Sequence, residues 1–311
     1  SSIASNLSMT PVLMGNTVVW KPSTTAILSN YYLMKIYEEA GVPAGVVNFI
    51  PGSGAVIGKE IFASKDLAGV HFTGSSATFN TLWKQVGENI ANYRSYPRLV
   101  GETGGKDFIF VHPSAVAEEV GTAAYCGAFE YQGQKCSAAS RMYAPKSLWP
   151  AILEKIKATA AQVRMGDVCD PSNFINAVID EASFDNIASY IDYAKASKDA
   201  EIVLGGGYDK SKGYFVEPTV IVTTDPHFKS MEEEIFGPVL TVYVYEDADV
   251  DKAVELCDTT SPYGLTGAIW GRDRLALEKI SRKLKYAAGN FYINDKPTGA
   301  VVGMQPFGGA R

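Results

Sequence analysis

The chain contains few of the residues that build disulfide frameworks or metal centres. Its 311 residues include four cysteines and three histidines. No two cysteines have Cys-x-x-Cys spacing, and His71, His112 and His227 are isolated from one another and from other potential ligands. We therefore expect reduced thiols in a reducing compartment, with neither a disulfide framework nor a metal site.

Long apolar runs and an excess of basic charge are also absent. No apolar stretch approaches the ~20 residues that a membrane-spanning helix needs. The formal net charge is −6, and the 28 Lys and Arg residues are scattered along the sequence. We therefore expect neither nucleic acid nor a membrane as a partner, and favour a small-molecule substrate. The apolar content of 46% is enough for the core of one large or two ordinary domains.

Alternating extended and helical patterns predict an α/β fold. Residues 18–21 and 46–50 have the pattern of strands and flank a segment with helical spacing. The alternation begins again with a strand at residues 108–111. We expect two consecutive domains, residues 1–104 and residues 105–311, each with a parallel sheet covered by helices on both faces.

The second of these domains has further helical patterns and one glycine-rich turn. Helices are expected over about 115–130, over the stretch from Ile152 to Val163 and over the stretch from Phe184 to Ile191. Gly205-Gly206-Gly207 lies between two extended segments, so we expect a hairpin turn there rather than a phosphate loop.

Two turns that follow predicted strands have residues suited to a pyrophosphate. The stretch from Gly52 to Gly58 has the pattern Gly-x-Gly-x-x-x-Gly, one residue from the usual dinucleotide fingerprint, and a helix is expected directly after it. Ser75 follows a strand at the expected start of another helix, where hydroxyl and N–H groups face an anion. Both patterns also occur in plain turns and helix caps, so neither alone indicates a nucleotide.

A cysteine and an upstream glutamate form a candidate catalytic pair. Cys136 is flanked by Lys135 and Ser137, with no apolar neighbour to bury its thiol, and Glu102 lies among glycines in residues 101–106. Covalent aldehyde oxidation needs such a pair, because a thiolate adds to the carbonyl and a base later activates water. Alone, a cysteine is more often an inert packing residue and a carboxylate beside glycines is more often a turn residue. The other cysteines are expected to be inert packing residues: Cys126, Cys169 and Cys257.

These two motifs resemble those of the aldehyde dehydrogenase superfamily, which has its nucleophile in Gly-Gln-x-Cys and its base in Glu-x-Gly-Gly-Lys. In the superfamily, as here, the motif of the base precedes that of the nucleophile. Further blocks of the sequence match in order: residues 15–22, 72–75, 233–239 and 306–309. The resemblance implies an aldehyde dehydrogenase-like fold, with a Rossmann-type NAD-binding domain followed by an α/β catalytic domain that carries the nucleophilic cysteine. It also implies that no metal is needed.

The resemblance implies NAD as the cofactor and assigns residues to it. Lys21 would hold the adenosine ribose and Ser75 the pyrophosphate, to which the glycine turn at Gly52 is also suited. Glu234 would bind the nicotinamide ribose with Phe236 beside it. Without the resemblance, the acidic run that includes Glu234 would be a solvated patch.

One departure from the family concerns the choice between NAD and NADP. Many NAD-using relatives have a Glu three residues after the motif Lys, where it accepts the ribose hydroxyls, and this chain has Thr24. A neutral residue does not repel a 2′-phosphate, so NAD is favoured and NADP stays open.

Residues 129–138, 289–296 and 305–311 more narrowly resemble the branch of the family that oxidises L-glutamate γ-semialdehyde. This aldehyde forms when Δ1-pyrroline-5-carboxylate hydrolyses, and its product is L-glutamate in proline catabolism. The resemblance places the enzyme in the mitochondrial matrix of eukaryotes and implies that the parent enzyme is a homo-oligomer.

The same resemblance assigns a substrate site. Ser137 would contact the substrate, Gly299 would offer a backbone N–H to the α-carboxylate, and Phe307 would cover the aliphatic stem. Ala300 stands where some relatives have Ser, so only its N–H is available. The lost hydroxyl contact would cost about 1 kcal/mol and weaken binding without changing the reaction.

Superfamily members extend beyond the matching blocks on both sides, so we expect this chain to be an internal portion of a larger protein. The second oxyanion donor of the family, an Asn side chain, would then lie just upstream of Ser1. Two alternatives stay open. The chain could act as an NAD-binding module that is catalytically incomplete, or the enzyme could oxidise another short semialdehyde.

Overall fold

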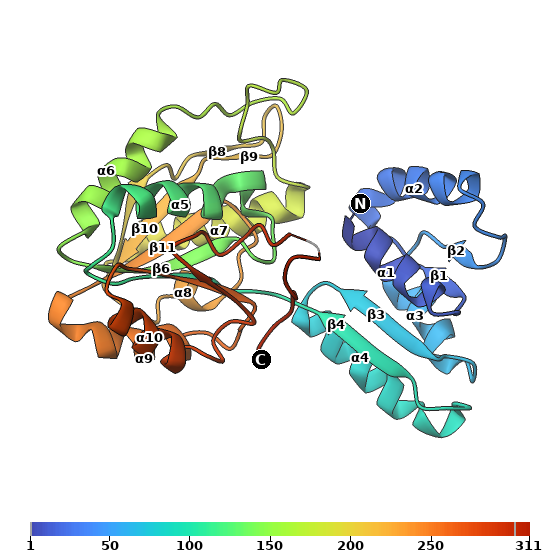
Figure 1. Cartoon of the computed structure of the whole chain (residues 1–311). Coiled ribbons are helices and arrows are strands. Elements are labelled where there is room, and N and C mark those ends of the chain that lie inside the picture. The colour runs from blue at the N-terminus through green and yellow to red at the C-terminus, as the bar shows by residue number, and fades with distance from the viewer. Residues whose placement is uncertain (1, 302) are drawn as a thin grey trace. The chain divides into compact units, whose positions relative to one another are not determined.

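The computed structural model describes residues 2–301 and 303–311 and shows an α/β chain (Figure 1). The chain divides into two compact units, Ser1–Thr103 (unit 1) and Gly104–Arg311 (unit 2). Each unit has its own hydrophobic clusters, so each is described by itself.

Unit 1 alternates helices with short strands. Its elements are α1 (Ser2–Leu13), β1 (Val18–Trp20), α2 (Ile27–Glu39), β2 (Val47–Phe49), α3 (Gly54–Ala63), β3 (Gly69–Thr73), α4 (Ser76–Glu88) and β4 (Arg98–Glu102). Within the described residues, β1 pairs in parallel with β2 and β3 pairs in parallel with β4, as two separate two-stranded sheets. The strand-helix alternation is the expected one, whereas a single open sheet is not formed by these four strands.

The local sequence explains where the elements of unit 1 end. The predicted helix α2 begins at Ile27 and ends at Glu39, because Gly41 adopts a left-handed conformation with φ 89°. Trp20 of β1, Tyr37 of α2 and Val47 of β2 form the buried cluster between these elements. The first two strands are thereby fixed against α2.

Unit 2 contains the larger sheet. Its elements are β5 (Asp107–Val111), α5 (Ala117–Phe129), β6 (Ala139–Pro145), α6 (Trp149–Ala160), α7 (Glu181–Ala196), β7 (Ala200–Leu204), β8 (Tyr208–Asp209), β9 (Phe215–Val216), β10 (Thr219–Thr223), α8 (Lys229–Glu232), β11 (Val239–Tyr245), α9 (Val250–Thr259), β12 (Thr266–Trp270), α10 (Arg274–Lys283) and β13 (Asn290–Ile293). Over the described residues the sheet has seven strands in the order β13-β12-β5-β6-β11-β10-β7. All neighbours pair in parallel except β7, which is antiparallel to β10.

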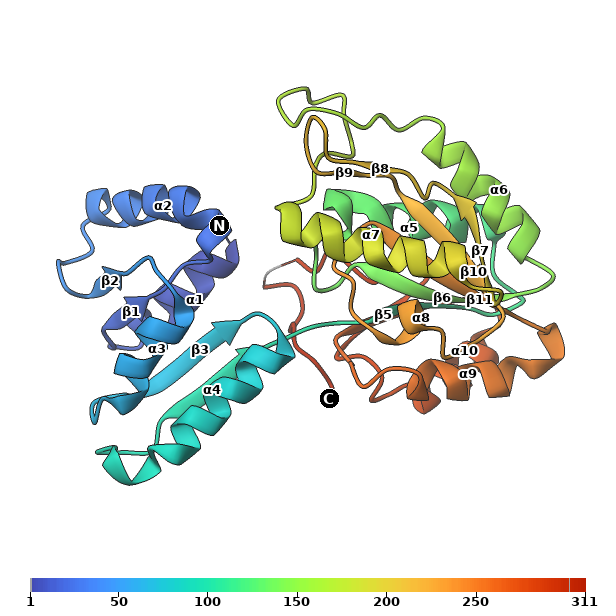
Figure 2. The same cartoon turned by 180° about the vertical axis from the view of Figure 1, so that it is seen from behind.

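Helices cover both faces of this sheet. Strand β5 is buried throughout, and its side chains alternate between two clusters. Ile109 and Val111 pack towards α5 and α6 (Figure 1). Phe108 and Phe110 pack towards α7, α9 and α10. Figure 2 shows these helices with the molecule turned by 180°. A parallel sheet buried on both faces gives uniformly apolar strands, as this one does.

Two predicted details of unit 2 differ from the structure. Helix α6 ends at Ala160, so Val163 lies beyond it, in a turn closed by its N–H to the Ala160 carbonyl. Val163 still packs on the same core, which explains its helical spacing. The chain does reverse direction after β7 to pair β10, but the glycines at 205–207 lead into the small β8–β9 ladder before β10 begins.

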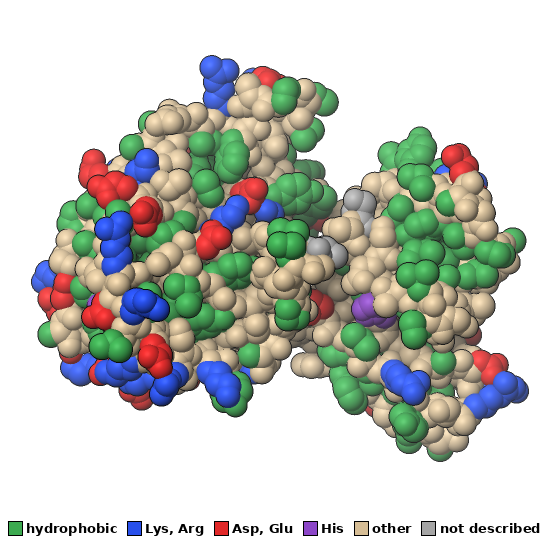
Figure 3. Space-filling model, in the orientation of Figure 1, with side chains coloured by type: hydrophobic (Ala, Val, Ile, Leu, Met, Phe, Trp, Pro, Cys, Tyr) green, Lys and Arg blue, Asp and Glu red, His purple; other side chains and the backbone are tan. Residues whose placement is uncertain are grey.

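Charged side chains of both signs are interspersed on the face of unit 2 shown in Figure 3. At the α9–α10 surface, for example, Asp251 pairs with both Lys279 and Lys283, at 2.7 and 3.2 Å. Within the described ranges, no helix has both the length and the apolar character to cross a membrane.

Candidate functional site

Lys21 and the glycine turn lie at the carboxyl ends of the paired strands β1 and β2. Helix α3 begins at Gly54, and Gly52 has a φ of 153° that favours glycine. A Cβ at Gly54 would lie 3.8 Å from Lys21 Cδ, so the lysine chain runs beside this turn. The structure thus brings Lys21 and the Gly52 turn together at a helix N-terminus, where N–H groups and a cation favour an anion.

Ser75 and Glu102 lie at the carboxyl ends of β3 and β4. Ser75 is the N-cap of α4, with its Oγ accepting from the Thr78 N–H at 3.2 Å, as predicted. The Gly74 N–H donates to the Glu102 carbonyl at 3.2 Å and ties the two strand ends together. Partial burial raises the pKa of Glu102 above its ordinary value. A carboxylate with a raised pKa is a stronger base for proton transfer from water.

The candidate nucleophile lies in residues 130–137, which follow α5 and which we call the nucleophile turn. Tyr131 and Gln132 have φ values of 57° and 58°. Such left-handed conformations cost about 1–3 kcal/mol in non-glycine residues and persist only where the surroundings hold them. Here the Ile179 N–H donates to Gln134 Oε1 at 2.8 Å, and Lys135 Nζ donates to Glu130 Oε2 at 2.8 Å. Cys136 itself is half-buried.

Two glycines allow three segments to meet at the nucleophile turn. A Cβ at Gly105 would lie 2.2 Å from the Cys136 carbonyl oxygen. A Cβ at Gly133 would lie 2.3 Å from the Gly237 carbonyl oxygen. Both distances are far below a permissible contact, so only glycine fits at either position. The segment that begins unit 2, the nucleophile turn and the turn before β11 are therefore packed backbone against backbone.

The turn before β11 carries Glu234 and Phe236. Glu234 Oε1 accepts from the Gly105 N–H at 2.8 Å, and burial raises the pKa of this carboxyl. Phe236 has φ 58° and is 46% exposed, whereas its neighbour Ile235 is buried. Glu234, Phe236 and Gly105 line one small recess together. An acceptor and an exposed ring beside the nucleophile turn suit a ribose and its attached base.

Three of the four predicted substrate residues lie in two neighbouring segments of unit 2. Ser137 is buried, and its Oγ lies 2.7 Å from the Thr298 hydroxyl, directly before Gly299. Gly299 has φ 97°, which a residue with a side chain rarely adopts. The structure therefore brings Ser137 and the segment of Gly299 and Ala300 together. The Ser137 hydroxyl has a protein partner in Thr298, which the sequence did not indicate.

Phe307 lies in the segment that follows. It is 43% exposed, as a residue that covers a substrate would be. This segment is fastened to the start of β13, because Asn290 Nδ2 donates to the Pro306 carbonyl at 2.7 Å and its Oδ1 accepts from the Gly308 N–H at 3.1 Å.

A sequence model of the aldehyde dehydrogenase family matches residues 2–311. The chain belongs to this family. A curated relative from Dictyostelium discoideum, mitochondrial Δ1-pyrroline-5-carboxylate dehydrogenase, is 56% identical over 313 residues, which are 100% of this chain and 56% of the relative. The human protein of the same name is 47% identical over 312 residues, covering 100% of this chain and 55% of that protein. The chain thus spans little more than half of the relatives it matches.

Solved structures agree with this membership. A Δ1-pyrroline-5-carboxylate dehydrogenase from Mycobacterium tuberculosis, bound with NAD, has a TM-score of 0.94 and 50% identity over 100% of this chain and 57% of that one. The NAD-bound enzyme from Thermus has a TM-score of 0.91 and 35% identity over 99% of this chain and 58% of that one. The predicted aldehyde dehydrogenase-like α/β fold is confirmed.

In this aldehyde dehydrogenase-family chain, Glu102 belongs to unit 1 and Cys136 to unit 2. The cofactor residues predicted from sequence are divided in the same way, with Lys21 and Ser75 in unit 1 and Glu234 in unit 2. Each unit thus carries its own group of candidate residues at the carboxyl ends of strands or in the turns beside them.

A buried polar cluster behind the nucleophile turn was not predicted. Lys106 Nζ donates to Ser140 Oγ at 2.6 Å, Arg141 Nε donates to the Lys106 carbonyl at 2.8 Å, and the Thr266 N–H donates to Asp107 Oδ1 at 2.7 Å. Burial, aided by the charge of Arg141, lowers the pKa of Lys106 to about 7. Burial raises the pKa of Asp107 to about 8. The only signal in the sequence was that Lys106 ends the motif of the candidate base.

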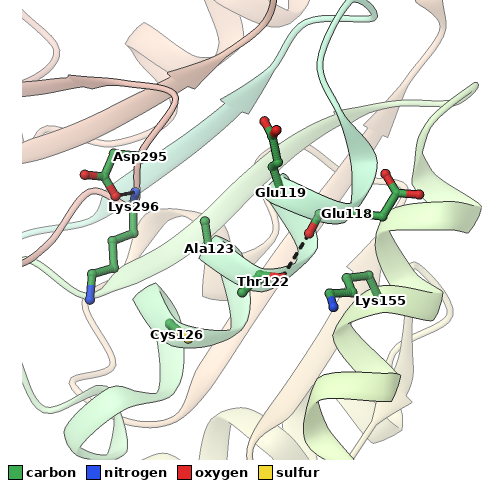
Figure 4. A pocket seen from close by; sticks show the side chains of 8 residues that line it. All are labelled: Glu118, Glu119, Thr122, Ala123, Cys126, Lys155, Asp295 and Lys296. Carbon is green, nitrogen blue, oxygen red and sulfur yellow. Dashed lines mark hydrogen bonds between the residues drawn. The ribbon is translucent and has the colours of Figure 1, made fainter.

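The remaining cysteines differ from one another in exposure. Cys257 is buried, as predicted, and burial raises its pKa to about 12. Cys126 is half-buried and lines an open pocket of about 550 Å³ formed by α5, α6 and residues 295–296 (Figure 4). The prediction that Cys169 is a packing residue is wrong. It is exposed in a polar turn, where its N–H donates to Asp167 Oδ1 at 2.8 Å. No group of three potential metal ligands occurs within the ranges that the structure describes.

Proposed function

We propose that this chain carries the nucleotide-binding and catalytic parts of an NAD-dependent dehydrogenase that oxidises L-glutamate γ-semialdehyde to L-glutamate. The observation that supports this most is the packing of Gly105 and Glu234 around the nucleophile turn of Cys136, in a chain that is 56% identical to a Δ1-pyrroline-5-carboxylate dehydrogenase. The reaction would belong to proline catabolism. Because several eukaryotic relatives are named mitochondrial, we infer the mitochondrial matrix for a eukaryotic source.

Each unit has residues that suit one part of a dinucleotide. In unit 1, Lys21 and Gly52 would hold the adenosine ribose and the adjoining phosphate, and Ser75 would face the pyrophosphate from the start of α4. In unit 2, Glu234 would accept from the hydroxyls of the nicotinamide ribose, with Phe236 beside it. When bound, NAD supplies the acceptor for the hydride that leaves the substrate carbon.

The chemistry would begin at Cys136. Its thiolate adds to the aldehyde carbon, and the Cys136 N–H stabilises the oxygen that becomes negative. Loss of hydride from that carbon leaves a thioester. Glu102 then takes a proton from water, the resulting hydroxide adds to the thioester carbon, and the C–S bond breaks. L-Glutamate and the Cys136 thiolate are the products of this step.

The substrate would be oriented by the segments beside Cys136. Ser137 lies next to the nucleophile, and the N–H groups of Gly299 and Ala300 would bind the α-carboxylate. Phe307 would cover the aliphatic stem of the substrate. Assembly of the parent enzyme as a homo-oligomer stays a prediction.

The direct test follows NADH formation by this chain with Δ1-pyrroline-5-carboxylate and with a short neutral aldehyde. We expect turnover with the first substrate and loss of turnover in Cys136→Ala, while Cys169→Ala retains it. Faster turnover of the neutral aldehyde would overturn the substrate assignment. Nucleotide binding without turnover of either aldehyde would instead support an NAD-binding module.

A further inference from the structure

The segment of residues 296–300, which we call the substrate loop, is fastened to the nucleophile turn by two contacts. The first is the hydroxyl pair of Ser137 and Thr298, whose oxygens are 2.7 Å apart. Both residues are buried, with 8% and 4% exposure. In this pair one hydroxyl donates and the other accepts, so the loss of one hydroxyl leaves the other without this buried partner, at a cost of about 1–3 kcal/mol.

The second contact is an ion pair. Glu130 Oε2 accepts from Lys135 Nζ at 2.8 Å within the nucleophile turn and from Lys296 Nζ at 3.3 Å in the substrate loop. All three side chains are about one-third exposed. Solvent screening keeps partly exposed pairs weak, so this contact supports the hydroxyl pair rather than replacing it.

The start of the substrate loop is also packed against α5. A Cβ at Gly127 would lie 3.3 Å from Lys296 Cβ and 3.5 Å from Pro297 Cδ, so the loop lies directly on the helix at that glycine. Beyond Thr298 the constraints change, because Gly299 has φ 97° and a Cβ placed on it would meet only Lys296 side-chain atoms within 4 Å, apart from its chain neighbours. Thr298 is therefore the last side chain that holds the loop before Gly299.

We infer that Thr298 is a positioning residue that orients the Gly299 N–H relative to the nucleophile turn. It thereby determines affinity and selectivity for a substrate with an α-carboxylate. This inference rests on the proposed function. The Gly299 N–H belongs to the peptide plane that Thr298 begins, so the orientation of that plane follows the Thr298 side chain. The Ser137 hydroxyl serves as its anchor, next to the nucleophile.

The test compares Thr298→Val, which keeps the shape and removes the hydroxyl, with Thr298→Ser, which keeps the hydroxyl. Hydrogen exchange of the peptide that contains residues 296–301 is measured in each, with and without L-glutamate. We expect about 10-fold faster exchange in Thr298→Val and near wild-type exchange in Thr298→Ser, since the loss of a buried partner corresponds to about 5- to 150-fold in an equilibrium. L-Glutamate should slow exchange in wild type and in Thr298→Ser only.

Kinetics separate this role from a general structural one. We expect KM for Δ1-pyrroline-5-carboxylate to rise about 10-fold in Thr298→Val, with kcat and the constants for a neutral aldehyde within about twofold of wild type. Glu130→Gln should raise the same KM by about threefold or less. Equal losses with both aldehydes, or unchanged exchange in Thr298→Val, would overturn the inference.

Failure of the proposed function can be distinguished from failure of the inference about Thr298. If the wild-type chain turns over neither aldehyde, the proposed activity of the chain fails, while hydrogen exchange and its protection by L-glutamate still decide the role of Thr298. If turnover occurs and L-glutamate protects wild type and Thr298→Val alike, the activity stands and the role of Thr298 is refuted.

Discussion

Gly105→Ala should damage the site without altering any group that takes part in the chemistry. The new Cβ would lie 2.2 Å from the Cys136 carbonyl oxygen and 2.6 Å from Asp107 Oδ2, whereas real Cβ contacts are essentially never under 3.0 Å. The nearer atom belongs to the backbone, so a rotamer change cannot relieve the contact. Either the start of β5 or the nucleophile turn must move.

The expected magnitudes follow from that displacement. Overpacking of this kind costs about 1–3 kcal/mol, which in a domain of this size lowers Tm by about 2–12 °C. A shift of about 1 Å at the reacting sulfur costs about 100-fold in rate. Differential scanning calorimetry and NADH formation measure the two effects separately.

A matched control is Gly87→Ala in the last turn of α4. A Cβ at Gly87 meets nothing within 4 Å, so the same chemical change should leave activity intact and raise stability by up to roughly 1 kcal/mol. If Gly105→Ala kept both the wild-type Tm and the wild-type rate, the close packing of β5 against the nucleophile turn would be refuted.

Three further predictions concern single groups. Ser75→Ala removes the N-cap of α4 and should cost about 1 kcal/mol on thermal unfolding while weakening NAD binding in a titration; unchanged binding would exclude Ser75 from the pyrophosphate site. Burial raises the pKa of Cys257 to about 12, so its thiol should stay unalkylated by iodoacetamide at neutral pH while exposed Cys169 reacts. Peptide mass spectrometry measures both alkylation rates, and equal rates would contradict the burial of Cys257. Because the raised pKa of Glu102 keeps the carboxyl protonated to higher pH, thioester hydrolysis should rise with pH around a midpoint above the ordinary Glu value, and Glu102→Gln should abolish that rise.

The sequence predicted the parts of the fold and site that depend on short patterns. The strand-turn-helix motif with Ser75 at its N-cap needed only local information, because the cap bonds a residue three positions away. The pattern at residues 108–111 likewise indicated a strand, which is β5. Motifs around Cys136, Glu102 and Glu234 carried the family resemblance, which the family match then confirmed at the level of the family.

What the sequence could not predict depends on contacts between distant residues. The hydroxyl pair of Ser137 and Thr298 joins residues 161 positions apart, and nothing in the pattern around Thr298 indicates it. The packing of Gly105 on Cys136 and of Gly133 on Gly237 also joins residues that are far apart in the sequence. The backbone that packs against each of these glycines could be identified only in the folded chain.

The most direct measurement of the central claim is to trap the covalent intermediate. Glu102→Gln should allow Cys136 to form the thioester and prevent its hydrolysis, so intact-mass and peptide mass spectrometry of that variant with NAD and Δ1-pyrroline-5-carboxylate decide the matter. The account predicts a glutamyl adduct on the Cys136 peptide that requires NAD and is lost in Cys136→Ala. An adduct on another cysteine, or none in a variant that still binds NAD, would contradict it.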